Sequence, residues 1–188
     1  MTTATTQPRP TTIAAALRNL YYVRFGFAIV WAVLVAFTAS AIGPFSAVLL
    51  VLYPVFDLVA AIVDHRASRA TRSAPLLFVN MGLSLLAAIA LGFAVTAGVT
   101  AVLIVWGIWA VTAGAVQLIV AITRYRLGGQ WPMILSGGIS VLAGAGFILM
   151  SASSTSLAGP AGYATLGGIF FLISAIRLQR PAKRDAKA

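Results

Sequence analysis

Six long apolar segments fill most of this chain, and they constrain its fold more than any other feature. Each is close to the ~20 residues that an α-helix needs to cross the hydrocarbon layer of a membrane. The strict alternation of polar and apolar residues expected of a membrane β-barrel is absent. The sequence therefore predicts an all-α, polytopic membrane protein. The predicted spans are 21–39, 44–64, 75–96, 99–122, 131–151 and 162–178.

Composition agrees with a bilayer as the solvent. Hydrophobic residues make up 61% of the chain and charged residues 9%, whereas soluble domains are about half apolar and a quarter charged. A net charge of +10 would suggest nucleic acid as the partner of a soluble protein. Here the cations flank apolar spans, so we expect anionic lipid headgroups as partners and no nucleic acid. With no cysteine and one histidine, we expect no metal site and no cofactor.

The connections between spans alternate between basic and uncharged. Lys and Arg resist translocation and mark the cytoplasmic side. Both termini and the basic connections are therefore predicted to be cytoplasmic. A signal-peptide cleavage site at Ala39–Ala41 is the alternative for the first span. The basic side carries His65, Arg66, Arg69, Arg72, Arg124, Arg126, Arg177, Arg180, Lys183, Arg184 and Lys187.

Three segments follow from this topology. Residues 1–20 are predicted to be a cytoplasmic, partly disordered segment with a short interfacial helix at 11–20. Residues 21–178 form the membrane domain, and residues 179–188 form a basic cytoplasmic tail. Aromatic residues near span ends are predicted to anchor at the membrane interface. They are Tyr21, Tyr22, Tyr125, Trp131 and Tyr163.

An internal repeat of one helical hairpin is also predicted. Gly26, Gly82 and Gly138 recur at equal spacing, and the same shift aligns neighbouring segments. The repeats cover about 21–66, 75–124 and 131–178. Two helices per unit keep every copy in the same orientation, which implies a pseudo-threefold arrangement about the membrane normal. The alternative is chance matching in a chain rich in Ala, Gly and Leu.

The first, third and fifth spans carry a small residue at every fourth position. Small side chains let helices approach closely in a membrane, where exclusion from water does not drive association. We expect these residues to line a central contact among the three odd spans. A conducting pore would need a more polar lining. The residues are Ala28, Ala32, Ala36 and Ser40; Ser84, Ala88, Gly92 and Thr96; and Ser140 and Gly144.

Polar residues inside spans are the candidates for function. Arg24, Asn80 and Ser136 occupy equivalent repeat positions and are expected to converge near the cytoplasmic side. Asp57 lies in the inner half of the second span and Asp64 at its boundary.

Two main interpretations of these carboxylates stay open. In one, Arg24 forms an ion pair with Asp57 or Asp64. In the other, Asp57 and Asp64 relay protons or cations to His65; binding of a partner protein is a third possibility. Gln117 on the fourth span is expected to form an interhelical hydrogen bond.

Two segments of this chain resemble a known family. WGIWAVTAGAVQLIVA (106–121) and LSGGISVLAGAGFIL (135–149) are similar to the HdeD-like acid-resistance membrane proteins, a bacterial family with a short membrane repeat. The resemblance covers roughly 20–178 and includes Trp131 before the fifth span. It implies a six-span inner-membrane protein linked to survival at low pH, with no catalytic motif to transfer. The first hairpin departs from the family pattern at Arg24, Pro54 and Asp57.

The sequence thus favours a non-enzymatic, HdeD-like membrane protein of the bacterial inner membrane with a role in stress or acid resistance. A small transporter or proton-conducting protein that uses Asp57 is one alternative. An accessory subunit of a larger membrane complex is another, with a membrane protein or a second copy of the chain as partner.

Overall fold

The computed structural model describes residues 10–67 and 74–185, and this part of the chain is all-α. Six helices in it are long and apolar enough to cross a membrane, which confirms the spans predicted from the sequence. A short 3₁₀ helix, η1 (Tyr125–Leu127), lies between the fourth and fifth. The six are α1 (Pro10–Phe37), α2 (Pro44–Ala67), α3 (Ala74–Ala97), α4 (Val99–Thr123), α5 (Trp131–Met150) and α6 (Ala158–Asp185).

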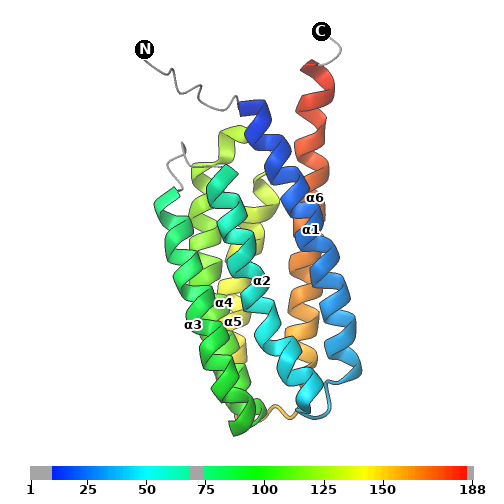
Figure 1. Cartoon of the computed structure of the whole chain (residues 1–188), viewed down its shortest axis with the longest axis vertical. Coiled ribbons are helices and arrows are strands. Elements are labelled where there is room, and N and C mark those ends of the chain that lie inside the picture. The colour runs from blue at the N-terminus through cyan, green and yellow to red at the C-terminus, as the bar shows by residue number, and fades with distance from the viewer. Residues whose placement is uncertain (1–9, 68–73, 186–188) are drawn as a thin grey trace, which may run out of the picture.

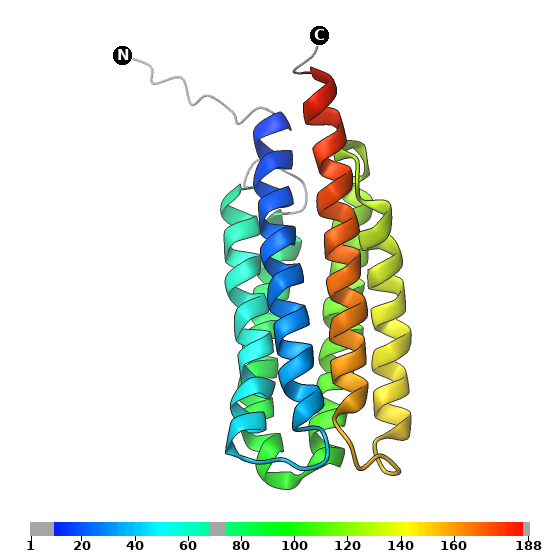
Figure 2. The same ribbon diagram turned by 90° about the vertical axis from the view of Figure 1, so that its right-hand side faces the viewer.

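The helices form a closed ring in chain order. Each helix packs against its predecessor and its successor, and α6 returns to pack along α1 (Figure 2). The N-termini of α1 and α3, the C-termini of α2 and α6 and the α4–α5 connection lie at one end of the bundle (Figure 1). We call this the basic end, because the exposed Arg66, Arg126 and Arg177 belong to it. The opposite end, with the α1–α2, α3–α4 and α5–α6 connections, is the uncharged end.

Local chemistry explains where several helices begin. Pro44 opens α2, and Pro132 occupies the first turn of α5, where a missing N–H costs least. Gly98 alone separates α3 from α4 and has φ 99°, a left-handed conformation that glycine adopts without a steric penalty. These residues set tight turns that keep consecutive helices antiparallel neighbours.

The polarity of the bundle is reversed relative to a soluble protein. Large apolar side chains such as Phe37, Phe93, Leu142 and Leu149 are exposed on its outside. Several polar side chains are buried inside, among them Asp64, Ser84, Arg124 and Gln130. An outer surface of this kind matches a hydrocarbon solvent, in which polar groups must find partners within the protein.

The structure differs from the sequence prediction at the start of α1. Residues 11–20 do not form a separate interfacial helix, because α1 runs without a break from Pro10. Ile13, Leu17 and Leu20 are buried, and the first two belong to a cluster with α6 residues such as Leu178. Their spacing of four and three residues places them on one helical face, which packs on α6 instead of lying on the membrane. Residues 1–9 and 186–188 lie outside the described residues.

The predicted central contact among the odd helices is wrong. No pair among α1, α3 and α5 makes more than a marginal contact within the described residues. The small residues serve contacts with even helices instead. Gly144 faces Gly107 of α4, and Ala28 faces Gly168 of α6. Of the remaining stripe positions, Ala32, Ala88 and Ser140 are buried, whereas Ala36, Ser40, Gly92 and Thr96 are exposed.

The closest helix approach is between α4 and α5. A Cβ built on Gly107 would lie 2.6 Å from the backbone oxygen of Gly144, and one built on Gly137 would lie 2.8 Å from the backbone oxygen of Gly114. Real Cβ atoms do not come this near, so both crossings require glycine. Direct backbone packing of this kind is the usual basis of helix association in membranes.

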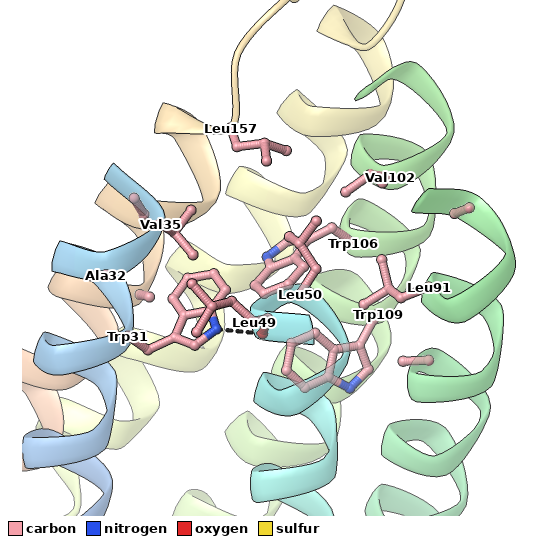
Figure 3. Close-up of a cluster of buried hydrophobic side chains, with 14 residues drawn as sticks. Trp31, Ala32, Val35, Leu49, Leu50, Leu91, Val102, Trp106, Trp109 and Leu157 are labelled. Atoms are coloured by element: carbon pink, nitrogen blue, oxygen red, sulfur yellow. Dashed lines mark hydrogen bonds between the residues drawn. The ribbon is translucent and has the colours of Figure 1, made fainter. Parts of the chain in front are cut away.

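The interior towards the uncharged end is filled by aromatic rings. Trp31 of α1 stacks on Trp106 of α4 with 5.2 Å between ring centroids, and Trp109 meets Trp106 edge-on at 5.5 Å. The Trp31 indole N–H donates a 2.6 Å hydrogen bond to the Leu49 backbone oxygen (Figure 3). Trp31 and Trp106 are almost fully buried, at 1% and 0% exposure. These side chains, and not the small-residue stripes, occupy the centre of the ring.

Candidate functional site: a polar cavity between two ion pairs

A cavity of about 100 Å³ lies inside the ring, on the basic side of the aromatic cluster. All six helices contribute to its wall. Its polar lining includes every member of the cluster predicted from sequence and adds several more residues. The polar and charged lining residues are Tyr21, Arg24, Tyr53, Asp57, Asp64, Asn80, Trp109, Gln117, Arg124, Gln130, Ser136, Ser140 and Tyr163.

Asp57 of α2 is held by three partners. Arg24 of α1 forms an ion pair with its Oδ1 atom. The Asn80 amide and the Ser84 hydroxyl of α3 both donate to Oδ2, at 2.8 Å and 2.7 Å. The carboxylate therefore ties three consecutive helices together. Of the interpretations left open by the sequence, the structure has the ion pair, with Asp57 as the partner of Arg24, and Asn80 hydrogen-bonds to the same carboxylate.

Arg24 is further supported by an aromatic ring. Its guanidinium carbon lies 4.8 Å from the centroid of the Phe171 ring on α6. A cation over the face of a ring is attracted by the ring quadrupole, and the attraction strengthens where water is excluded. Arg24 thus links α6 and α1 to the Asp57 carboxylate on α2.

Asp64 has a different partner, which the sequence analysis did not foresee. Arg124, just after α4, donates two 2.8 Å hydrogen bonds to the two Asp64 oxygens. The side chains are 2% and 8% exposed, so this is a buried, bidentate pair. Burial lowers the pKa of the Arg124 guanidinium, but the hydrogen bonds and charge of Asp64 outweigh it and leave that pKa above its ordinary value. Arg124 therefore stays protonated.

Hydrogen bonds between helices complete the wall. Gln117 of α4 donates through Nε2 to the Met133 backbone oxygen of α5 at 3.3 Å, which confirms its predicted interhelical role. The Tyr163 hydroxyl of α6 donates to the Ser140 hydroxyl of α5 at 3.0 Å. Ser136 lines the same cavity from α5. Arg24, Asn80 and Ser136, which the sequence analysis aligned with one another, therefore line one cavity.

The connection before α5 folds a glutamine into the bundle. Gly128 and Gly129 have φ values of 76° and 64°, which glycine tolerates without strain. Ser174 of α6 anchors the turn by donating to the Gly129 backbone oxygen at 2.8 Å. Gln130 then lies 2% exposed against the cavity, with Nε2 donating to the Gly128 oxygen. Its Oε1 atom has no hydrogen-bond partner among the described residues.

His65 does not join the site. Its ring packs on Phe78 with 4.2 Å between centroids, and it is absent from the cavity wall. Its Nδ1 atom is buried without a partner in the described part of the chain. Because Asp57 and Asp64 are each bonded to an arginine, this arrangement does not form the continuous relay from Asp57 through Asp64 to His65.

Sequence reasoning did not place several of the lining residues in the site. Arg124 was interpreted as a loop cation, and Gln130 carried no signal beyond its place after two glycines. Tyr21 and Tyr163 were expected at the membrane interface, but both line the cavity. A polar residue at a span end can face either the headgroups or the interior, and sequence alone does not distinguish the two.

The arrangement makes a polar chamber that is closed at one side. Tyr53 and Trp109, whose centroids are 5.9 Å apart, belong both to its wall and to the aromatic packing beyond it. Within the residues described, no group of three or more His, Cys, Asp or Glu is placed to hold a metal ion. The chamber offers hydrogen bonds and two neutralised ion pairs, not a charged binding centre.

Comparison with known proteins gives no match: no family model, no curated protein and no solved structure is similar to this chain at a significant level.

Proposed function

We propose that the chain is a non-enzymatic, HdeD-like integral membrane protein that helps a bacterium withstand acid stress. The main observation in support is that Asp57 is bonded to Arg24, Asn80 and Ser84 at the same time. A carboxylate with this many partners is suited to hold helices together, because both of its oxygens are occupied by donors from neighbouring helices. The bundle would contribute as a rigid, acid-tolerant membrane component.

The proposal includes three parallel hairpin repeats around a pseudo-threefold axis. Its support is that Arg24, Asn80 and Ser136 reach the same cavity from α1, α3 and α5. The equivalent glycines Gly26, Gly82 and Gly138 also share an environment, since a Cβ built on any of them meets no atom within 4 Å. Related positions that meet related surroundings are expected of repeats.

The proposed location is the bacterial inner membrane, with both termini in the cytoplasm. The gathering of Arg66, Arg126 and Arg177 at one end of the bundle supports this orientation. Anionic lipid headgroups are the expected partners of that end. A second copy of the chain or another membrane protein is the proposed partner within the bilayer.

Proton or ion conduction through Asp57 is the second candidate, because a polar cavity reaches this carboxylate. The aromatic packing beyond Tyr53 and Trp109 speaks against it, since an open path needs a continuous polar route.

Two assays separate the candidates. An acid-sensitive bacterial host that expresses the native chain is expected to survive an acid challenge better than one with an empty vector. Vesicles containing the purified protein and a pH-sensitive dye are expected to acidify no faster than protein-free vesicles. Equal survival with and without the protein, at verified expression, would overturn the proposal. Proton flux that disappears in Asp57→Asn would instead establish the second candidate.

A further inference from the structure

We propose that the cavity between the two ion pairs binds a small uncharged solute that hydrogen-bonds to Gln130. This inference concerns the cavity alone and does not depend on the HdeD-like resemblance. Four properties of the cavity carry it: its size, its electroneutrality, one unsatisfied acceptor, and its closed end.

The size admits a molecule larger than water. The cavity has a volume of about 100 Å³, against the ~10–15 Å³ that a single water needs. The two acids that mark its extent, Asp57 and Asp64, are seven residues apart on α2, or roughly 10 Å at 1.5 Å per residue. Between them the wall is formed by small residues, including Ala61, Ala113 and Gly114. These leave room for a solute of a few non-hydrogen atoms.

The charges select against ions. The charged groups on the wall are Arg24, Asp57, Asp64 and Arg124, whose formal charges cancel. Each arginine is already bonded to one carboxylate. A bound ion would have to compete with these internal bonds in a site of low dielectric, whereas an uncharged solute would not. The cavity therefore favours a molecule without net or local formal charge.

An unsatisfied acceptor defines the chemistry of the occupant. Gln130 is 98% buried, its Nε2 is already bonded to the Gly128 oxygen, and its Oε1 has no partner among the described residues. A buried carbonyl oxygen left without a hydrogen bond is unfavourable. The occupant must therefore bring an N–H or O–H donor. Gln117 and Asn80 present further amides on the same wall.

The closed end makes the cavity a pocket instead of a pore. Trp31, Leu50, Val102 and Trp106, all at most 1% exposed, fill the interior towards the uncharged end. Gln130 and Arg124 form the part of the wall nearest the basic end. The solute therefore enters and leaves at the basic end. Small amides and polyols combine the required size, neutrality and donors.

The experiment compares two probes of the same shape. Acetamide is uncharged and carries N–H donors, whereas acetate has a nearly identical outline and a negative charge. Saturation-transfer NMR on the purified chain in nanodiscs is expected to detect acetamide and not acetate. Glycerol, a polyol, should displace acetamide.

Two variants locate the binding on the molecule. Gly167 lines the cavity, and a Cβ built there meets no atom within 4 Å. Gly167→Leu is expected to fill the cavity and abolish the acetamide signal. Gly162→Leu is the matched control, because it adds the same side chain on the same helix in open space, away from the cavity. Gln130→Leu removes the acceptor and is expected to weaken acetamide binding at least tenfold.

Several results would overturn the proposal. The first is the absence of any signal from acetamide or glycerol with the native chain, which would mean that the cavity holds only water. The second is a signal from acetate equal to that from acetamide. The third is an acetamide signal that is undiminished in both Gly167→Leu and Gln130→Leu. Should Gly167→Leu fail to fold, Gln130→Leu decides alone.

Discussion

Arg124 donates a hydrogen bond of 2.8 Å to each carboxylate oxygen of Asp64, 60 residues earlier in the chain. The pair connects the end of α4 to α2, two helices that also meet through the Tyr53 ring, 5.5 Å from that of Trp106 and 5.9 Å from that of Trp109. It lies in the wall of the polar cavity at the basic end, opposite the aromatic rings that fill the interior towards the uncharged end. The ring of helices is therefore joined across its centre by charge at one end and by aromatic contact at the other.

Removal of one partner from this pair should be costly. Arg124→Gln leaves a buried carboxylate without its cation, and we expect a loss of about 3–5 kcal/mol in the free energy of unfolding. Arg124→Lys keeps the charge but lacks the planar fork that bonds both oxygens, so its loss should be smaller. Unfolding in a detergent–SDS titration measures both. Native stability in Arg124→Gln would contradict a structural role for the pair.

The glycine contact between α4 and α5 gives a second prediction. Gly144→Ala places a Cβ 2.6 Å from the Gly107 backbone oxygen, so the helices must separate and the midpoint of thermal unfolding should fall. Gly138→Ala, on the same helix, meets no atom within 4 Å and should be neutral or stabilising by about 0.5–1 kcal/mol. An equal response of the two variants would refute close backbone packing at Gly144.

The aromatic cluster gives a third prediction. Trp31→Phe leaves the Leu49 oxygen without its indole donor and weakens the stack on Trp106. We expect a loss of about 1–3 kcal/mol in the free energy of unfolding, from one buried hydrogen bond and one aromatic contact. Trp131→Phe is the control, because Trp131 is 41% exposed and lies under Arg177 at the rim of the bundle. A larger effect at Trp131 than at Trp31 would argue against a core role for the cluster.

Orientation in the membrane can be tested with single cysteine substitutions, because the chain contains no native cysteine to remove first. Tyr125 at the basic end and Ser153 at the uncharged end are both exposed. A membrane-impermeant maleimide added to intact cells should label Ser153→Cys and not Tyr125→Cys, with both labelled after lysis. The reverse pattern would invert the predicted topology.

The sequence was sufficient for those features that depend on composition along the chain. Apolar runs of the right length predicted all six spans. The position of Arg24 on the neighbouring span made it a candidate ion-pair partner for Asp57 or Asp64. Arg124 could not be assigned in the same way, because a cation after a span satisfies the positive-inside rule whether it faces lipid or the interior. The Arg124 side chain points into the bundle because of how the α4–α5 connection packs, with the Gly129 backbone bonded to α6.

The helix that each row of small residues contacts could not be predicted from the sequence either. A stripe at every fourth position identifies a close contact but does not name the partner helix. Ser140 and Gly144 meet α4 because the α4–α5 connection is short and the centre of the ring is taken up by Trp31, Trp106 and the polar cavity. The glycines of α4 that contact them, Gly107 and Gly114, did not belong to any of the small-residue patterns identified in the sequence.

The most direct test of the account is a double-mutant cycle at Arg24 and Asp57, with the free energy of unfolding as the readout. Asp57→Asn and Arg24→Gln should each destabilise the protein strongly, because each leaves the other charge inside the bundle without its counter-charge. The double variant should be more stable than the sum of the two losses predicts, by about 0.5–3 kcal/mol, as for residues in contact. Losses that add within about 0.5 kcal/mol would show that the two side chains act independently, and would contradict an interior held together by compensated charge.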